Sequence, residues 1–520
     1  MHAQRDFVLE GRLPRQTEAL VQDLALHPLF EAMARGDAGV AEVVRRALLE
    51  PLTDPAAIAY RQAVLADCLA NRSVARALHA LAVAAIERAE LFSWGFMPRR
   101  PESIVRFSHD VLLEYLRAFR ELRRIAERSA EGFTSAGFRA FFALIREELD
   151  DAYLREVEQQ VRELRFQAGI RVSVRLGAAN KGSDHVVQRA TARDRLAATK
   201  VGNLWHRLRG GPDPLLTYQL PSRDENAVKA LALVRDRALE RVAEVVARAT
   251  DHVIGFFHAL RAETAFYVGC LNLHERLDAL DAPMCVPEPL DQSVGAHTAA
   301  GLYDPCLALQ AGKAAVVNDL GADGTDLVLV TGANQGGKTT FLRSVGVAQL
   351  MMQCGMFAPA RSFRASVATG LFTHFKREED ASMTSGKLDE ELARMSAIVD
   401  ELTPGSLLLL NESFAATNER EGSEIAQQIV DAVTEAGVRV VFVTHLNEFA
   451  RTRFERDEAG TLCLRAERRP DGTRTFRLHE AVPERTSHGA DLYHAIFEDD
   501  GPARPPEPSV PGDRRRDGAG

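Results

Sequence analysis

The sequence predicts a multidomain protein in which a mainly α-helical region precedes an α/β domain with a mostly parallel sheet. Apolar residues recur at spacings of three and four from about residue 19 to residue 160, which is typical of packed helices. A second helical stripe follows residue 222. From about residue 287 onward, apolar β-rich runs alternate with helical stretches, as they do in an α/β domain.

The composition limits the class of protein. The 520 residues are enough for roughly two to four domains. The six cysteines lie singly, without the C-x-x-C spacing of metal or redox sites. We find neither a signal peptide pattern nor an apolar run long enough to span a bilayer, so we expect a soluble, cytoplasmic protein that contacts no membrane. The net charge of −9 argues against a uniformly basic nucleic-acid-binding surface but allows a local basic patch.

Punctuation residues divide the helical region. Asp54 and Pro55 interrupt its pattern, and because proline suits the first turn of a helix, a new helix is predicted to begin there. Near Arg165 the period becomes two, which predicts a strand over residues 170–176, and residues 177 and 180–183 then read as a turn. Residues 165–209 contain ten Lys and Arg against two acids, a charge of +8 inside a −9 protein.

A long helix is predicted after this basic insert. Residues 222–225 read Ser-Arg-Asp-Glu, which is a capping-box pattern. Apolar residues then continue on one stripe from Leu231 to Leu260. A helix of this length spans a domain or acts as a lever.

Residues 332–339 read Gly-Ala-Asn-Gln-Gly-Gly-Lys-Thr and fit G-x-x-x-x-G-K-[ST] at every fixed position, between an apolar strand and a helix. In such a loop, backbone N–H groups and the helix N-terminus surround phosphate oxygens. We therefore predict an ATP site in which Lys338 reaches the β- and γ-phosphates and the Thr339 hydroxyl binds Mg²⁺. The predicted nucleotide-binding residues of this loop are Gly332, Asn334, Gly336, Gly337, Lys338, Thr339 and Thr340.

Two further strand ends predict the catalytic groups. The apolar run 407–410 ends in Asn411 and Glu412, which resembles a Walker B arrangement with Glu412 polarising the attacking water. Asn411 stands where an aspartate is usual, so it contacts Mg²⁺ only through water and adds no negative charge. The run 440–443 ends in Thr444 and His445, which resembles the γ-phosphate-sensing histidine of ABC-type ATPases. The alternatives are a surface acid for Glu412 and a structural role for His445.

These segments are similar to the ATPase domain of the MutS family of DNA mismatch repair proteins. Residues 331–340 resemble the family's TGPNMGGKST loop, and 411–418 stand where the family has DEIGRGTS. Residues 385–387 take the place of its Ser-Gly signature loop, and 487–489 resemble its SYG. Residues 51–62 are similar to the PL-D…I..RQ segment of the MutS core domain. The resemblance covers roughly residues 15–497.

The resemblance implies a division into domains, completed by a proline-rich end that we expect to be disordered. The predicted parts are a helical MutS-like core domain (1–164), a basic β-containing insert as a reduced clamp (165–221), a long lever helix with a return to the core (222–286), a P-loop ABC-type ATPase domain (287–497) and a disordered tail (498–520).

The resemblance also implies partners. ABC-type heads close as a homodimer, in which Ser385 of the signature loop would touch the partner's nucleotide. The family's clamp grips DNA backbone, and Arg171, Arg175 and Lys181 of the basic insert are the predicted phosphate contacts. The alternative for the insert is a solvated basic surface. We expect no mismatch-reading or connector domain, because the chain starts close to the core domain, and therefore no mismatch recognition.

Three functions are compatible with these features. The first is a MutS-like ATPase that couples ATP-driven dimer closure to DNA binding in DNA repair or recombination. The second is a nucleotide-gated scaffold with little hydrolysis that acts on protein partners, which Asn411 and the altered signature loop favour. The third is an ABC-type ATPase that acts on a protein partner without nucleic acid.

Overall fold

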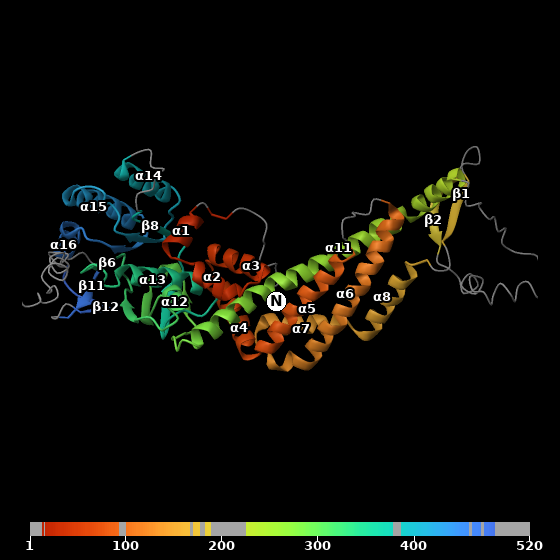
Figure 1. Ribbon diagram of the computed structural model, residues 1–520, viewed down its shortest axis with the longest axis horizontal. Helices are drawn as coiled ribbons and strands as arrows, with labels where there is room; N and C mark the ends of the chain where they lie inside the picture. The colour runs from red at the N-terminus through yellow and green to blue at the C-terminus, as the bar shows by residue number, and fades with distance from the viewer. Residues whose placement is uncertain are drawn as a thin grey trace, which may run out of the picture. The chain divides into compact units, whose positions relative to one another are not determined.

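The structure is a computed structural model that describes residues 13–14, 16–92, 100–166, 170–176, 182–188, 225–377, 386–456, 460–469 and 473–483. The chain forms two compact units. Unit 1 comprises Met1–Asp291, Pro305–Ala315 and Val347–Val367, and unit 2 comprises Gln292–Asp304, Val316–Gly346 and Ala368–Gly520. The predicted fold class, a mainly helical region followed by an α/β region, is confirmed (Figure 1).

Helices dominate the described part of unit 1. Pro55 begins α4, as predicted from the sequence, and the carboxylate of Asp54 accepts a hydrogen bond from the Ala56 N–H at 3.0 Å. The helices are α1 (Thr17–Asp23), α2 (His27–Ala34), α3 (Ala38–Leu49), α4 (Pro55–Ala70), α5 (Arg72–Glu90), α6 (Pro101–Ser129), the 3₁₀ turn η1 (Ala130–Gly132), α7 (Ala136–Glu148), α8 (Asp151–Glu163), α11 (Glu225–Asp278) and α12 (Pro305–Ala311).

The predicted long helix is α11, which contains 54 residues and is therefore about 80 Å long. Residues 222–224 of the predicted capping box lie outside the described residues. α11 packs along α5 and α6 (Figure 1), and Tyr115 of α6 stacks on Phe257 of α11 with ring centroids 4.8 Å apart. Aromatic packing of this kind holds the apolar stripe of α11 against the helical region.

The basic insert contains an antiparallel strand pair in its described part. β1 (Arg171–Leu176) pairs with β2 (Gly182–Gln188), which confirms the predicted strand. Gly182 and Ser183, which we predicted to lie in the turn, belong to β2 instead, because they pair with Leu176 and Arg175 across the ladder. Residues 177–181 of the predicted turn lie outside the described residues.

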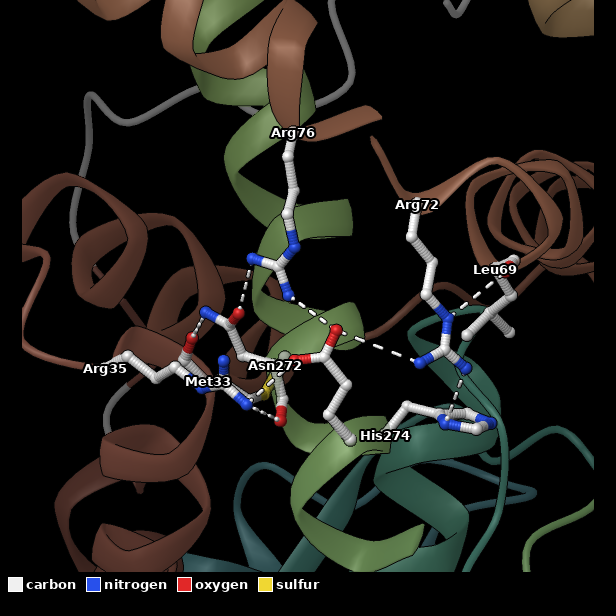
Figure 2. Close-up of polar contacts among 8 residues, drawn as sticks. Met33, Arg35, Leu69, Arg72, Arg76, Asn272 and His274 are labelled. Carbon is white, nitrogen blue, oxygen red and sulfur yellow. Dashed lines mark hydrogen bonds and ion pairs between the residues drawn. The ribbon is translucent and has the colours of Figure 1, made fainter. Parts of the chain in front are cut away.

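Three arginines, which Figure 2 labels, form ion pairs with one carboxylate near the C-terminal end of α11. Glu275 lies 2.9 Å from the guanidinium of Arg35, 3.0 Å from that of Arg76 and 3.8 Å from that of Arg72. Arg76 also donates to Asn272 Oδ1 at 2.8 Å (Figure 2). Arg35 follows α2, whereas Arg72 and Arg76 lie in the first two turns of α5, so this cluster ties two parts of the helical region to α11.

We expect Glu275→Gln to destabilise unit 1 by about 1 kcal/mol at pH 7, since these ion pairs are partly solvent-screened. Burial opposes ionisation of Glu275, but the hydrogen bond from Arg76 and the charges of Arg76 and Arg35 outweigh it and lower its pKa. Because the pKa of Glu275 is lower in the folded protein, its ionised carboxylate stabilises the fold at pH values above its ordinary pKa of 4.5. This stabilisation is lost as the pH falls through the folded-state pKa.

Thermal unfolding followed by circular dichroism at pH 7 and below pH 4 would measure this effect. The matched control is Glu244→Gln on the same helix, whose pair with Arg248 at 3.3 Å is well exposed and should contribute little. Equal melting temperatures for Glu275→Gln and the parent protein at pH 7 would contradict the prediction.

Unit 2 contains a six-stranded sheet within its described residues, in the order β12-β11-β6-β10-β9-β8. All neighbouring strands are parallel except β11 and β12, which are antiparallel. The strands are β6 (Leu327–Thr331), β8 (Leu371–Phe375), β9 (Leu407–Asn411), β10 (Arg439–Val443), β11 (Thr461–Arg468) and β12 (Arg474–Glu480). β4 (His297–Leu302) and β5 (Asn318–Gly321) pair antiparallel in this unit, outside the six-stranded sheet, and the 3₁₀ turn η3 (Gln292–Val294) precedes β4 in the chain.

Apolar packing explains why the central strands of unit 2 lack the alternation of a one-sided sheet. Leu408, Leu410 and Phe442 are fully buried and pack with Val430 and Phe449 from the covering helices. Strands buried on both faces read as continuous apolar runs. The helices of this region are α13 (Lys338–Gln353), α14 (Lys387–Val399), α15 (Glu419–Glu435) and α16 (Asn447–Glu455).

The C-terminal part of α13, residues 347–353, belongs to unit 1. Unit 1 also contains the parallel pair β3 (Glu288–Leu290) and β7 (Ser362–Ser366). Within the part of the chain that the structure describes, no helix is both long and apolar enough to cross a bilayer.

Candidate nucleotide-binding site

The loop between β6 and α13 has the compact form that a phosphate cradle requires. β6 ends at Thr331, and α13 begins at Lys338. Gly332 has a φ of +109°, which side-chain-bearing residues rarely adopt, and a Cβ on Gly336 would lie 2.8 Å from that of Ala466. The glycines therefore allow the loop to fold tightly in front of the helix N-terminus, where N–H groups favour anions.

Lys338 lies inside this loop. Its ammonium Nζ donates to the carbonyl oxygens of Gly332 at 2.8 Å and Ala333 at 2.9 Å. Burial lowers the pKa of Lys338 to about 8, with the Arg474 charge acting in the same direction and the carboxylate of Glu412 opposing both. The side chain is thus a mostly protonated cation at neutral pH, held within the glycine loop.

Thr339 and Asn411, the two residues predicted to hold Mg²⁺, are in contact with each other. The Thr339 hydroxyl donates to Asn411 Oδ1 at 3.0 Å. A hydroxyl and an amide oxygen are hard ligands of the kind that Mg²⁺ accepts, directly or through water. The pair fits a magnesium ion, although Asn411 supplies no negative charge to it.

Glu412 and His445 are adjacent because β9 and β10 end side by side. Asn411 pairs with Val443 in the parallel ladder, and the Glu412 N–H donates to the Val443 carbonyl at 2.8 Å. His445 Nε2 then lies 3.3 Å from Glu412 Oε1. The contact with His445 lowers the pKa of Glu412 against the effect of burial, and the charges of Lys376 and Lys338 act in the same direction. Glu412 is therefore a carboxylate at neutral pH and can accept a proton.

The remaining predicted site residues lie in several places. Asn334 is exposed at the outer part of the loop, and Thr340 is half-buried in the first turn of α13. Arg175 is exposed on β1, and Arg171 pairs with Gln188 at the other end of that ladder. The other predicted site residues, Ser385 and Lys181, lie outside the described part of the chain, as do residues 487–489.

Sequence reasoning missed several side chains around the loop. Lys376 follows β8, and its backbone N–H donates to the Asn411 carbonyl at 2.9 Å while its charge acts on Glu412. Arg474 of β12 donates to Gln335 Oε1 at 2.7 Å. No spacing in the sequence identifies these residues, because they reach the site only through the order of strands in the sheet.

Comparison with known proteins agrees with the geometry. Residues 53–280 match the family model of the MutS2 N-terminal domain, and residues 328–494 match MutS domain V. The DNA mismatch repair protein MutS of Chloroflexus aurantiacus is 31% identical over 195 residues, which are 36% of this chain and 20% of that protein. The Endonuclease MutS2 of Pelotomaculum thermopropionicum is 29% identical over 270 residues, covering 50% of this chain and 32% of that protein. The Endonuclease MutS2 of Gemmatimonas aurantiaca is 26% identical over 296 residues, covering 56% of this chain and 35% of that protein.

The matched region therefore spans only about a fifth to a third of the length of these three relatives. The two family models nevertheless match consecutive stretches, one over the helical region and one over the α/β region that holds the glycine loop. On these matches, the chain belongs to the MutS family, with a match to the MutS2 N-terminal domain over its helical region and to MutS domain V over its α/β region.

Proposed function

We propose that this chain hydrolyses ATP as a homodimer and couples closure of the dimer to DNA binding in DNA repair or recombination, without mismatch recognition. The main support is that Lys338, Glu412 and His445 follow the C-terminal ends of β6, β9 and β10, which are neighbours in one parallel sheet. Ligands of open α/β sheets bind at this edge. This arrangement supports the proposal that one site both binds phosphate and activates water.

In the proposed reaction, water attacks the γ-phosphorus of ATP, the bond to the β,γ-bridging oxygen breaks, and ADP and phosphate leave. Lys338 neutralises phosphate charge, and Glu412 orients the water and accepts its proton. His445 contacts Glu412 and orients it beside the γ-phosphate position. A magnesium ion held by Thr339, and through water by Asn411, would supply further positive charge at the phosphates.

Contacts within unit 1 support a coupling between nucleotide and helical region. The helical region binds the carbonyl groups at the C-terminal end of α13. The Leu52 N–H donates to the Gln353 carbonyl at 2.9 Å, and the buried Arg61 donates to the Cys354 carbonyl at 3.0 Å. Gly355 allows this approach, since a Cβ there would lie 2.6 Å from that of Arg61. A shift of α13 when its N-terminus binds phosphate would therefore reach the helical region directly.

The strand pair of the basic insert is the proposed DNA contact. Arg175 is exposed on β1, and the insert carries a charge of +8 over residues 165–209. Backbone contacts of this kind are independent of DNA sequence and release counterions, so they weaken as salt rises.

We expect the triple variant Arg171→Ala, Arg175→Ala and Lys181→Ala to weaken binding of duplex DNA, because it removes the proposed phosphate contacts. Each lost contact should also make the fall of log K with log salt less steep by about 1. Gel-shift titrations at two salt concentrations, with and without ATP, would measure the change. Arg124→Ala on α6 is the matched control, since Arg124 is 61% exposed and lies outside the insert. Unchanged affinity and salt slope in the triple variant would exclude the insert as the DNA contact.

The proposed activity is tested by steady-state ATP hydrolysis with and without duplex and branched DNA, in the presence of Mg²⁺. Mg²⁺-dependent turnover that changes on adding DNA would support the proposal. A second candidate, a nucleotide-gated scaffold, is favoured by Asn411, because the amide beside Thr339 adds no negative charge for the metal. ATP binding without turnover would identify the scaffold instead.

A further inference from the structure

A buried polar network surrounds the turn that follows Glu412. It consists of His374 at the end of β8, Glu391 on α14 and Ser413 in the turn itself, which are 0%, 5% and 0% exposed. None of the three belongs to the glycine loop or to the pair of carboxylate and histidine described above. Buried polar side chains of this kind are costly unless they are hydrogen-bonded to one another.

The network holds the turn from two sides. The Phe414 N–H donates to Glu391 Oε1 at 2.7 Å. Ser413 Oγ lies 2.7 Å from His374 Nδ1 and 2.7 Å from the His374 carbonyl oxygen. His374 Nε2 reaches the Glu391 carbonyl at 3.1 Å, and the His374 ring stacks on Phe414 with centroids 5.7 Å apart.

The hydrogen-bond partners define the state of His374. A carbonyl oxygen only accepts, so Nε2 carries a proton. Burial lowers the pKa of His374 to about 4, aided by the charges of Arg394 and Arg377, so the ring is neutral and Nδ1 is an acceptor. The Ser413 hydroxyl therefore donates its single proton, shared between Nδ1 and the His374 carbonyl.

The turn needs this support because its backbone is unusual. Glu412 has a φ of +53° and Phe414 a φ of +66°, both in the left-handed region. Residues other than glycine adopt this conformation at an energetic cost and keep it only where their surroundings enforce it. The direction of the Glu412 side chain depends on that backbone, since the turn leaves β9 at Asn411.

We propose that Glu391 and His374 are positioning residues for ATP hydrolysis, which fix the turn at Ser413 and Phe414 and thereby aim the Glu412 carboxylate at the attacking water. This inference rests on the hydrolysis proposed above. The inference gives α14 a role in the site: its residue Glu391 supplies the acceptor oxygen that holds the backbone N–H of Phe414, two residues after the proposed base Glu412.

The test compares Glu391→Ala, Glu391→Gln and His374→Phe in the full chain. Glu391→Gln keeps the Oε1 acceptor, and His374→Phe keeps the stacked ring while losing both hydrogen bonds. A misplacement of the base by about 1 Å costs about 100-fold in rate, so we expect Glu391→Ala to lower kcat by about 10- to 100-fold. KM and the dissociation constant for ATP should change by no more than about twofold, because Lys338 and the loop are untouched. Glu391→Gln should restore most of kcat, and His374→Phe should fall between the two.

Hydrogen exchange of a peptide spanning residues 411–417 gives a readout that does not require turnover. Glu391→Ala should speed exchange at the Phe414 amide, while Asp400→Ala, an exposed acid at the end of the same helix, should leave both exchange and kcat unchanged. Unchanged kcat in Glu391→Ala, or equal losses of ATP binding and kcat, would overturn the positioning role. A wild-type chain that binds ATP without turnover would refute the proposed hydrolysis and with it the aiming of Glu412, whereas the exchange rate would still report whether Glu391 holds the turn.

Discussion

Lys338→Ala is expected to abolish ATP binding at concentrations that saturate the wild-type protein. The ammonium is buried inside the glycine loop and is the one charged side chain of the motif that can face the β- and γ-phosphates. Charge-assisted hydrogen bonds contribute about 1.5–3 kcal/mol each. Losing two of them weakens binding by about 100-fold or more.

Equilibrium binding of ATP measured by titration calorimetry in the presence of Mg²⁺ would check this prediction. Lys313→Ala is a suitable control, because Lys313 is an exposed lysine outside the motif. Circular dichroism must accompany the measurement, since Lys338 also ties the carbonyls of Gly332 and Ala333 together. A folded Lys338→Ala protein with wild-type affinity for ATP would contradict the assignment of the loop.

Glu412→Gln is expected to lower kcat by about 100-fold or more while leaving ATP binding nearly unchanged. The amide has the shape of the carboxylate and keeps the turn and the contact with His445, but it cannot accept a proton from water. The wild-type group is ionised, as this task requires, because its contact with His445 lowers its pKa despite burial.

Single-turnover and steady-state hydrolysis, together with ATP titration, would measure the two effects separately. Glu424→Gln on α15 serves as the control, because Glu424 is exposed and pairs only with Arg420 one helical turn away among its described contacts. If Glu412→Gln keeps the wild-type kcat, water is activated by another group and the resemblance to Walker B carries no chemistry here.

The natural asparagine at position 411, where an aspartate is usual, has a consequence for the metal. The Thr339 hydroxyl donates to the Asn411 amide oxygen, a geometry that an aspartate at this position would share. The difference is one negative charge beside the cation site, which affects how tightly Mg²⁺ is held. We therefore expect Asn411 to hold Mg²⁺ less tightly than an aspartate would, and this expectation is what favours the nucleotide-gated scaffold as the second candidate.

The sequence alone determined the main parts of the molecule. Apolar residues spaced three and four apart predicted the helical region and α11, because one face of each helix is buried. Continuous apolar runs predicted the parallel strands, because both faces of such a sheet are buried. The loop motif predicted the strand, the turn and the helix start around Lys338 and Thr339, since its spacing is itself that geometry; the roles of the two residues stay predictions. Gly182 and Ser183 show the limit of such reasoning, because turn-forming residues were drawn into a strand by their pairing partners.

Only the tertiary structure decided which distant residues meet. The sheet order places β10 between β6 and β9, so Glu412 and His445 come together from segments more than thirty residues apart. Folding likewise brings His374 and Glu391 to the turn after Glu412, and Arg61 to the peptide group of Cys354, 293 residues later in the chain. Local patterns record which face of an element is buried, whereas contacts between elements depend on packing partners that no short stretch of sequence specifies.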